Sequence, residues 1–453
     1  MTNRLRSDSA SGHQDCFGVK QANSGRRAVM ATRRQFIQYS AAAAAGLAGG
    51  MELQAAGLNS VTWKSGDWPW WRGPSHNGIA EAGQQVPQTW SESSGIAWRT
   101  AVPGLSHGAP IVVEDQVLVE IADHERQLQS LLCLDRSSGK QIWESVIHEG
   151  GLDVKGNKKS SMASAAASCD GERFFVNFLN GDSVWLTAVD RQGKRLWQTH
   201  VSSYVNHQGF GSSPLLWGDL VYSVADNKGG GAIIAANRET GEVVWKRDRP
   251  AVPNYSSPVI FEVKGREQLF LTGCDLVTSL DPATGREIWE IPGATTECVT
   301  TTVTDGSRIY TSGGYPKNHI SAVAADGSGK VVWENSTRSY VPSMLIHNGA
   351  LFAVLDAGIA MCWDSGTGEE LWKGRLGGTF SSSPVLVNEQ IYATDESGKT
   401  SIFAASREKF ELLQQNQLGA EVFSTPAICG NRIYNRIAAM EADRRQEYVV
   451  CIG

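Results

Sequence analysis

The chain has 453 residues, with 41 Lys and Arg against 47 Asp and Glu, and a formal net charge of −6 at pH 7. An acidic chain is a poor candidate for binding nucleic acid or an anionic membrane surface, so we expect neither partner. No apolar run reaches the length of about 18 residues that a transmembrane helix needs. The 48 Gly and 15 Trp, with only 19% charged residues, suit a protein with many tight turns and aromatic packing.

Residues 1–57 have the composition of an export signal. Arg33 and Arg34 precede an apolar pair and a short stretch rich in Ala and Gly, which is the twin-arginine pattern. The alternative is a chance Arg pair before an Ala-rich helix. Met30 lies just before the motif and is a candidate for the true start. We expect a folded protein exported by the twin-arginine route to the periplasm or the extracellular space.

Residues 58–97 form a Trp-rich lead-in. Four indoles are too many aromatic side chains for a free linker, and they belong to Trp68, Trp70, Trp71 and Trp90. We expect them to pack onto the rim of the following domain and to close an edge there. The alternative is a flat stacking surface for a sugar.

From Trp98 onward one phrase recurs: an apolar run, a short turn that usually carries Gly, and an apolar pair that ends in Trp. The clearest copy is VTSLDPATGREIW. Pro282 fixes φ in the turn, Asp281 can accept hydrogen bonds from the turn backbone, and Gly285 can adopt a positive φ. The phrase therefore predicts a β-hairpin whose Trp seals one unit against the next. The repeated Trp residues are Trp98, Trp143, Trp197, Trp245, Trp289, Trp333 and Trp372.

A second phrase precedes the first in each unit and predicts two more strands. Two copies are GSSPLLWGDLVYSVAD (211–226) and FSSSPVLVNEQIYATD (380–395), in which a Ser-Pro start, an apolar run and a short turn lead to a second strand. Each unit is therefore four short antiparallel strands. Four strands at an interval of about 40 to 50 residues predict an all-β fold, the β-propeller.

The two ends of this region predict how the ring closes. The last residues, EYVVCIG (447–453), match a third strand, but no Trp strand follows them. The strand around Trp98 has no hairpin partner before it, so pairing the two ends completes one blade. Counting a degenerate unit near 400–419, we predict an eight-bladed propeller over 98–453. Seven blades are the alternative, if that unit is an insertion.

These repeats resemble those of the PQQ-like propellers, the quinoprotein alcohol-dehydrogenase-like superfamily, whose repeat reads A-x-D-x-x-T-G-x-x-x-W. LDPATGREIW and LDRSSGKQIW match it closely, and DWPWWRGPSHNG (67–78) resembles the lead-in of planctomycete-type members. The resemblance covers about residues 67–453. It implies the propeller fold and leaves the function open, because the repeat is a packing signature.

The resemblance suggests two functions. Quinoprotein dehydrogenases of the superfamily hold PQQ beside Ca²⁺ on the axis and use a disulfide between adjacent Cys residues, but this sequence has no adjacent Cys pair and no CxxCH haem motif. The superfamily also contains an outer-membrane assembly lipoprotein, a scaffold whose signal ends in a lipobox Cys that is missing here.

We therefore expect an exported, non-catalytic, monomeric binding or scaffold protein for a partner protein or a small polar ligand, without cofactor or metal. A PQQ-dependent oxidoreductase with Ca²⁺ is the first alternative, and a polysaccharide-active enzyme is the second.

The cysteines do not predict a disulfide framework. Cys133, Cys362 and Cys451 occupy the same strand position in three separate blades, so we expect small buried core residues. Cys274 and Cys298 are the one plausible pair.

The predicted topology places any ligand site on one face, around the axis. The segments that lead into each first strand meet there with the turns between second and third strands. The segments contribute His107, His207, Gln208, Glu297 and Glu421, with Asn254, Tyr255 and Tyr340, and the turns contribute Asp226, Asp275, Asp356 and Asp395. Carboxylates around one mouth can bind a cation or a cationic partner. The alternative is that each Asp accepts hydrogen bonds from its own turn and that each His bonds locally.

Overall fold

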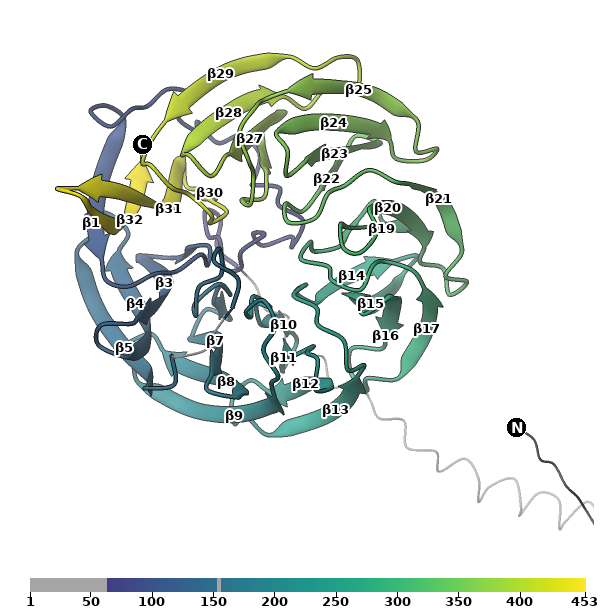
Figure 1. The fold of residues 1–453 in the computed structure, drawn as a ribbon, viewed down its shortest axis with the longest axis horizontal. Helices are drawn as coiled ribbons and strands as arrows, with labels where there is room; N and C mark the ends of the chain where they lie inside the picture. Colours follow the sequence, from purple (N-terminus) through teal and green to yellow (C-terminus); the bar gives the residue numbers. More distant parts are fainter. Residues whose placement is uncertain (1–62, 153–155) are drawn as a thin grey trace, which may run out of the picture. The chain divides into compact units, whose positions relative to one another are not determined.

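A computed structural model describes residues 63–152 and 156–453. Within that part the chain forms 32 β-strands, grouped into eight four-stranded antiparallel sheets that surround an axis as blades (Figure 1). The all-β prediction and the count of eight blades are confirmed. In the same residues no helix is long and apolar enough to cross a membrane. Arg33 and Arg34 lie outside the described residues, so the export signal stays a prediction.

The strands of each blade follow one another from the axis outward. The innermost strands, which number the blades 1 to 8, are β2 (Ile111–Val113), β6 (Ser168–Cys169), β10 (Leu215–Trp217), β14 (Val259–Val263), β18 (Val303–Thr304), β22 (Leu345–His347), β26 (Val385–Val387) and β30 (Ala427–Cys429). The second strands are β3 (Gln116–Asp123), β7 (Arg173–Asn180), β11 (Leu220–Val224), β15 (Arg266–Gly273), β19 (Arg308–Gly313), β23 (Ala350–Val354), β27 (Gln390–Thr394) and β31 (Arg432–Glu441).

The outer half of each blade holds the repeated phrase. The third strands are β4 (Leu128–Asp135), β8 (Ser183–Asp190), β12 (Gly231–Asn237), β16 (Leu276–Leu280), β20 (His319–Ala324), β24 (Ile359–Asp364), β28 (Lys399–Ala404) and β32 (Arg444–Ile452). The outermost strands are β5 (Gln141–Glu149), β9 (Arg195–Ser203), β13 (Val243–Arg249), β17 (Glu287–Pro292), β21 (Val331–Asn335), β25 (Glu370–Arg375), β29 (Leu412–Gln417) and β1 (Ile96–Val102).

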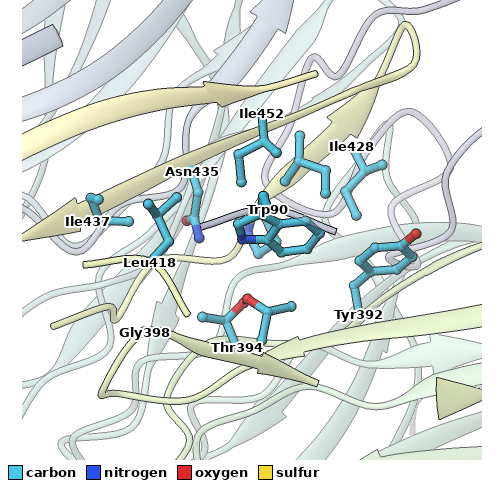
Figure 2. Close-up of a pocket in the computed structure, with 12 residues that line it drawn as sticks. Trp90, Tyr392, Thr394, Gly398, Leu418, Ile428, Asn435, Ile437 and Ile452 are labelled. Atoms are coloured by element: carbon cyan, nitrogen blue, oxygen red, sulfur yellow. The ribbon is translucent and has the colours of Figure 1, made fainter. Parts of the chain in front are cut away.

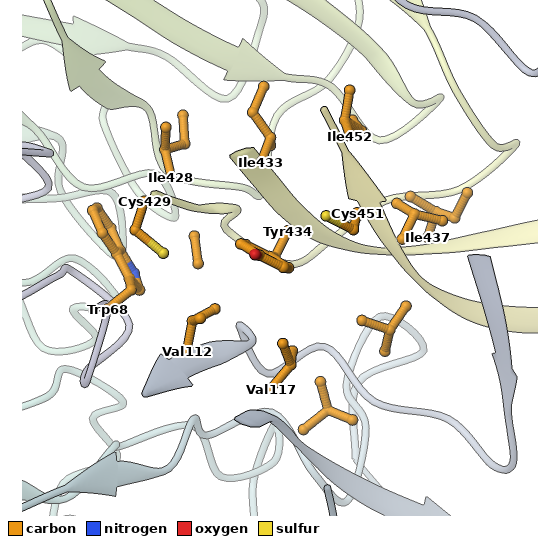
Figure 3. Packing of buried hydrophobic residues seen from close by; sticks show 14 of the residues in the cluster. Trp68, Val112, Val117, Ile428, Cys429, Ile433, Tyr434, Ile437, Cys451 and Ile452 are labelled. Atoms are coloured by element: carbon orange, nitrogen blue, oxygen red, sulfur yellow. The ribbon is translucent and has the colours of Figure 1, made fainter. Parts of the chain in front are cut away.

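Blade 8 joins the first strand to the last ones, as predicted. Its order is β1-β32-β31-β30, and Trp98 of β1 lies opposite Cys451 of β32. Figure 3 shows its core, where Tyr434 and Cys451 pack toward Val112 of blade 1. Trp68 of the lead-in joins this cluster and exchanges two backbone hydrogen bonds with Val112, of 2.6 and 2.9 Å. The closing blade is therefore sealed to blade 1 by a continuous apolar core.

Six of the seven repeated Trp residues pack against the turn glycine of the next blade, whereas Trp372 donates to the Ser406 carbonyl of a turn without glycine. Gly285 adopts φ +68°, and a Cβ there would lie 2.6 Å from the Trp245 ring. The indole Nε1 of Trp245 donates to the Pro282 carbonyl of that turn, at 2.9 Å. The same contact joins Trp98 to Gly139, Trp143 to Gly193, Trp197 to Gly241, Trp289 to Gly329 and Trp333 to Gly368. The repeated Gly and Trp are thus two sides of one contact, which confirms the predicted seal.

Blade 7 lacks the repeated Trp, and the lead-in supplies an indole instead. Gln414 stands at the register position that Trp372 occupies in blade 6. Trp90 is buried between blades 7 and 8, beside Tyr392 of β27 and Ile452 of β32 (Figure 2). The degenerate unit is therefore a complete blade whose seal comes from a distant part of the chain.

The first part of the lead-in crosses beneath the axis, on the side of the turns between first and second strands (Figure 1). The Trp70 indole donates to the Pro214 carbonyl of blade 3 at 2.7 Å. The buried Arg72 guanidinium donates to the carbonyls of Met344 at 2.5 Å and Pro384 at 3.1 Å, which lead into blades 6 and 7. The lead-in aromatics pack onto the propeller as expected, but across the axis and between blades rather than along the rim.

The cysteines form no disulfide among the described residues. Cys133, Cys362 and Cys451 are fully buried on third strands, as predicted. Cys274 and Cys298 are both free thiols. The Cys274 sulfur faces the carboxylate of Asp226 at 3.6 Å, whereas that of Cys298 faces the Thr295 carbonyl at 3.7 Å. The one plausible pair is therefore not formed, because the two side chains point to different partners.

Candidate functional site

A cavity of about 700 Å³ lies on the axis, where the segments leading into the innermost strands meet. We call this side of the propeller the mouth face. Rings make up much of the wall and come from Trp71, His107, His207, Phe210, Tyr255, Tyr315, Tyr340, Phe380 and Phe423. The charged side chains of the wall are Lys159, Glu297, Arg338, Asp356 and Glu396. A recess of this size with rings and a few polar groups has the character of a ligand site.

The end of the axis opposite the mouth is occupied by the lead-in. Trp71 lines the cavity there, and the neighbouring Arg72 is fully buried. Burial lowers the pKa of Arg72 to about 9, so the guanidinium stays charged at neutral pH. Its hydrogen bonds to two blade carbonyls satisfy that charge where water does not reach.

A ring of hydroxyl groups holds the leading segments in place. The Ser213 N–H donates to Oγ of Ser257 in the next blade at 2.9 Å. The Ser343 N–H donates to Oγ of Ser383 at 2.9 Å, and the Ser383 N–H donates to Oγ1 of Thr425 at 3.0 Å. These residues begin the repeated Ser-Pro phrase or its variants. The phrase thus fixes neighbouring blades to each other directly below the side chains of the cavity.

Glu297 is the most enclosed carboxylate of the cavity, with 3% of the residue exposed. Nε2 of His207 lies 3.2 Å from one carboxylate oxygen, and the Tyr340 hydroxyl donates to the other at 3.1 Å. The Glu297 N–H donates to the Tyr315 carbonyl at 3.2 Å, which fixes its backbone. Burial, and then the charge of Glu297, raises the pKa of Tyr255. One buried negative charge therefore dominates this side of the cavity.

A segment that precedes β6 bridges two other blades across the cavity wall. Nδ2 of Asn157 donates to Oε1 of Gln208 at 3.0 Å, in the segment leading into blade 3. Lys159 pairs with Glu396 of blade 7 at 2.7 Å, and the Ser381 hydroxyl donates to the same carboxylate at 2.7 Å. The bridge reaches two distant blades, and it neutralises Lys159 and Glu396 against each other.

His107 contributes a neutral ring to the wall. Its imidazole packs on Phe423 with centroids 4.3 Å apart. Burial, and then the charges of Arg436 and Arg445, lowers the pKa of His107 to about 3. The ring is therefore uncharged at neutral pH, and it acts as an aromatic surface.

The cavity brings together His107, His207, Gln208, Glu297 and Asp356 from the predicted ligand-binding set. Tyr255 and Tyr340, from the same leading segments, also line it. The carboxylate of Asp356 accepts hydrogen bonds from the backbone N–H groups of Tyr340 and Val341, at 2.9 and 3.2 Å.

The other predicted carboxylates lie outside the cavity. Asp226 is buried in a two-bond pair with Arg249, at 2.9 and 3.2 Å. Asp395 accepts hydrogen bonds from its own turn, as the alternative reading expected. Asp275 is exposed, and Glu421 pairs with Arg445 beside the mouth. Asn254, also named from the sequence, is buried and donates to Asp226 at 3.1 Å.

Sequence reasoning missed several residues of the wall. Trp71 was assigned to the lead-in as a whole, although only this indole of the segment reaches the cavity. Glu396 directly follows Asp395 in the same turn, and its carboxylate reaches Ser381 and Lys159 instead of its own turn. Lys159 and Arg338 carry no repeat signal, because their segments differ in length from blade to blade.

The residues present do not fit a Ca²⁺–quinone pair. In the described part of the chain, no group of three or more His, Cys, Asp or Glu side chains is placed to hold a metal ion. Glu396 already pairs with Lys159 and Asp356 accepts hydrogen bonds from backbone N–H groups, so Glu297 alone among the cavity carboxylates keeps acceptor positions, and one carboxylate is too few for a Ca²⁺ site.

Known proteins share this architecture. The family model of the outer membrane protein assembly factor BamB matches residues 79–204 and 127–374. The chain belongs to this family. BamB of Burkholderia pseudomallei (strain K96243) is 26% identical over 367 residues, which cover 77% of this chain and 84% of that protein. The predicted resemblance to PQQ-like propellers is thereby confirmed.

Two solved structures have a similar fold. The crystal structure of BamB from Moraxella catarrhalis has a TM-score of 0.56 at 16% identity and covers 78% of this chain and 99% of its own. A europium-containing methanol dehydrogenase has a TM-score of 0.48 at 11% identity, over 83% of this chain and 90% of its own.

Proposed function

We propose that this BamB-family chain is an exported scaffold that binds a partner protein at its mouth face and catalyses no reaction. The family match carries this proposal, because its relative is named an outer membrane protein assembly factor. A factor that assembles other proteins acts by binding them. The twin-arginine pattern of residues 1–57 supports export.

The surface around the cavity has the composition of a protein-binding site. Three apolar side chains of the mouth face are more than half exposed: Val205 at 54%, Tyr315 at 55% and Met440 at 61%. Tyr315 lines the cavity, whose wall consists largely of rings, whereas Val205 and Met440 lie outside it. Exposed apolar groups beside such a recess are typical of interaction sites. The opposite end of the axis is less suited to a partner, because the lead-in already covers it.

The tip of the β31–β32 hairpin adds to this surface. β31 pairs with β32 as far as Glu441, whereas the pairing of β32 with β1 stops at Glu447. The tip therefore projects beyond its neighbour, as Figure 1 shows, and it carries Met440. A projecting strand pair with a bare apolar side chain is a natural contact for another protein.

Site-specific photo-crosslinking in the native host tests the proposal. A crosslinking amino acid at Val205 or Met440 should capture one protein reproducibly, identified by mass spectrometry. The same amino acid at Lys409, an exposed position in the turn between β28 and β29, should not capture it. Equal capture at all three positions, or none at the mouth, contradicts partner binding there. Dye reduction by the purified protein with PQQ, Ca²⁺ and an alcohol would contradict the non-catalytic assignment.

A further inference from the structure

The buried carboxylate of Glu297 has no Lys or Arg partner among the described residues. Among the ion pairs of residues 63–152 and 156–453, Glu297 faces only His207, and no Lys or Arg reaches it. Its two hydrogen-bonding neighbours are His207 and Tyr340. A carboxylate has about four acceptor positions, so about two are left.

The other two carboxylates of the cavity are already engaged. Lys159 pairs with Glu396, and Asp356 accepts two backbone hydrogen bonds. The Arg338 guanidinium lies over the Tyr340 ring, 5.4 Å from its centroid. A buried charge is costly unless it is paired. Glu297 is therefore the cavity carboxylate that still has acceptor positions for a positive charge from outside.

Aromatic rings beside Glu297 suit the same kind of ligand. The Tyr340 hydroxyl donates to Glu297 at 3.1 Å, and Tyr255 lines the same cavity; burial, and then the charge of Glu297, raises the pKa values of both tyrosines. The face of a tyrosine ring attracts cations. Tyr340 already holds one guanidinium, that of Arg338, over its ring.

We propose that the cavity binds an arginine side chain of the partner protein. The guanidinium donates hydrogen bonds to the carboxylate of Glu297 and packs against the ring of Tyr255 or Tyr340. Arginine fits better than lysine, because its flat group can donate two bonds to a carboxylate while it stacks on a ring. This inference rests on the proposed function and names the group that the partner inserts.

Calorimetric titration of the purified protein with N-acetyl-L-arginine amide tests the chemistry. The neutral analogue N-acetyl-L-citrulline amide has nearly the same shape and should bind at least tenfold more weakly. Glu297→Gln keeps the size of the side chain and should lower the arginine affinity at least tenfold. Asp182→Asn is the matched control, because Asp182 is an exposed carboxylate of the mouth face outside the cavity, and it should change nothing.

Thermal melting checks that each variant is folded, and a second variant provides a further control. Tyr340→Phe keeps the ring, and the protein should retain the arginine affinity within about twofold while losing one hydrogen bond to Glu297. Equal binding of the arginine and citrulline amides, unchanged affinity in Glu297→Gln, or no binding of the arginine amide overturns the inference.

The crosslinking experiment separates this inference from the proposed function. In the Glu297→Gln protein, capture of the partner through Val205 should fall at least tenfold. Undiminished capture overturns the arginine site and leaves the scaffold function intact. Arginine binding without any captured partner overturns the scaffold function.

Discussion

Two features of position 285 require glycine, the positive φ and the contact with Trp245, and their effects on stability can be measured separately. Its φ of +68° strains any other residue, and a Cβ would meet the Trp245 ring at 2.6 Å. Gly265 has φ +74° but nothing within 4 Å of a Cβ, so it shares the strain without the clash. Gly285→Ala should therefore destabilise the protein by about 1–3 kcal/mol more than Gly265→Ala. Urea unfolding of both variants measures the difference, and equal losses would mean that the Trp contact contributes nothing.

At this scale the sequence predicts positions better than roles. Glu297 and His207 were placed at the mouth correctly, because both lie just before an innermost strand. Asp226 and Asp356 hold equivalent turn positions, yet Asp226 turns to a buried Arg249 and Asp356 lines the cavity. The direction in which the Asp side chain turns depends on whether a neighbouring side chain is a cation, and the sequence of the turn alone does not specify that neighbour.

Among the elements, the lead-in makes the most specific prediction. Trp90 fills the contact between blades 7 and 8, where the repeated Trp is missing. Trp90→Ala should cost about 3–5 kcal/mol, the range for a large aromatic side chain removed from a core. Trp63→Ala should cost less than half as much, because Trp63 is only partly buried. Denaturant titrations compare the two, and similar losses would contradict a sealing role for Trp90.

The blades themselves could be predicted, because every phrase that defines them is local. Even blade 7 was recognised, since its Ser-Pro start and second strand are intact. The path of the lead-in could not be predicted. Arg72 meets Pro384 at a separation of 312 residues, and no repeat links the two. Contacts of that kind depend on the finished ring rather than on a pattern in the chain.

For the whole molecule, the export route can be tested independently of the propeller. Replacing Arg33 and Arg34 by Lys should block export and leave precursor in the cytoplasm, because a receptor reads the pair as an address that charge alone does not reproduce. Cell fractionation with immunoblotting measures this. A matched variant with Arg26 and Arg27 replaced by Lys should be exported normally. Normal export of the first variant would contradict the twin-arginine route.

The ring closure was predicted from the two ends of the repeat region, and the structure joins them as β1 and β32. The closed end of the axis was not predicted, and it has a kinetic consequence. Because Trp71 and Arg72 lie at its base, the cavity is a recess rather than a channel through the propeller. Among the described residues the lead-in covers the far end of the axis, so we expect a molecule in the cavity to leave through the mouth. A protein bound over the mouth therefore blocks the exit of a molecule in the cavity, so the protein must dissociate before that molecule can leave.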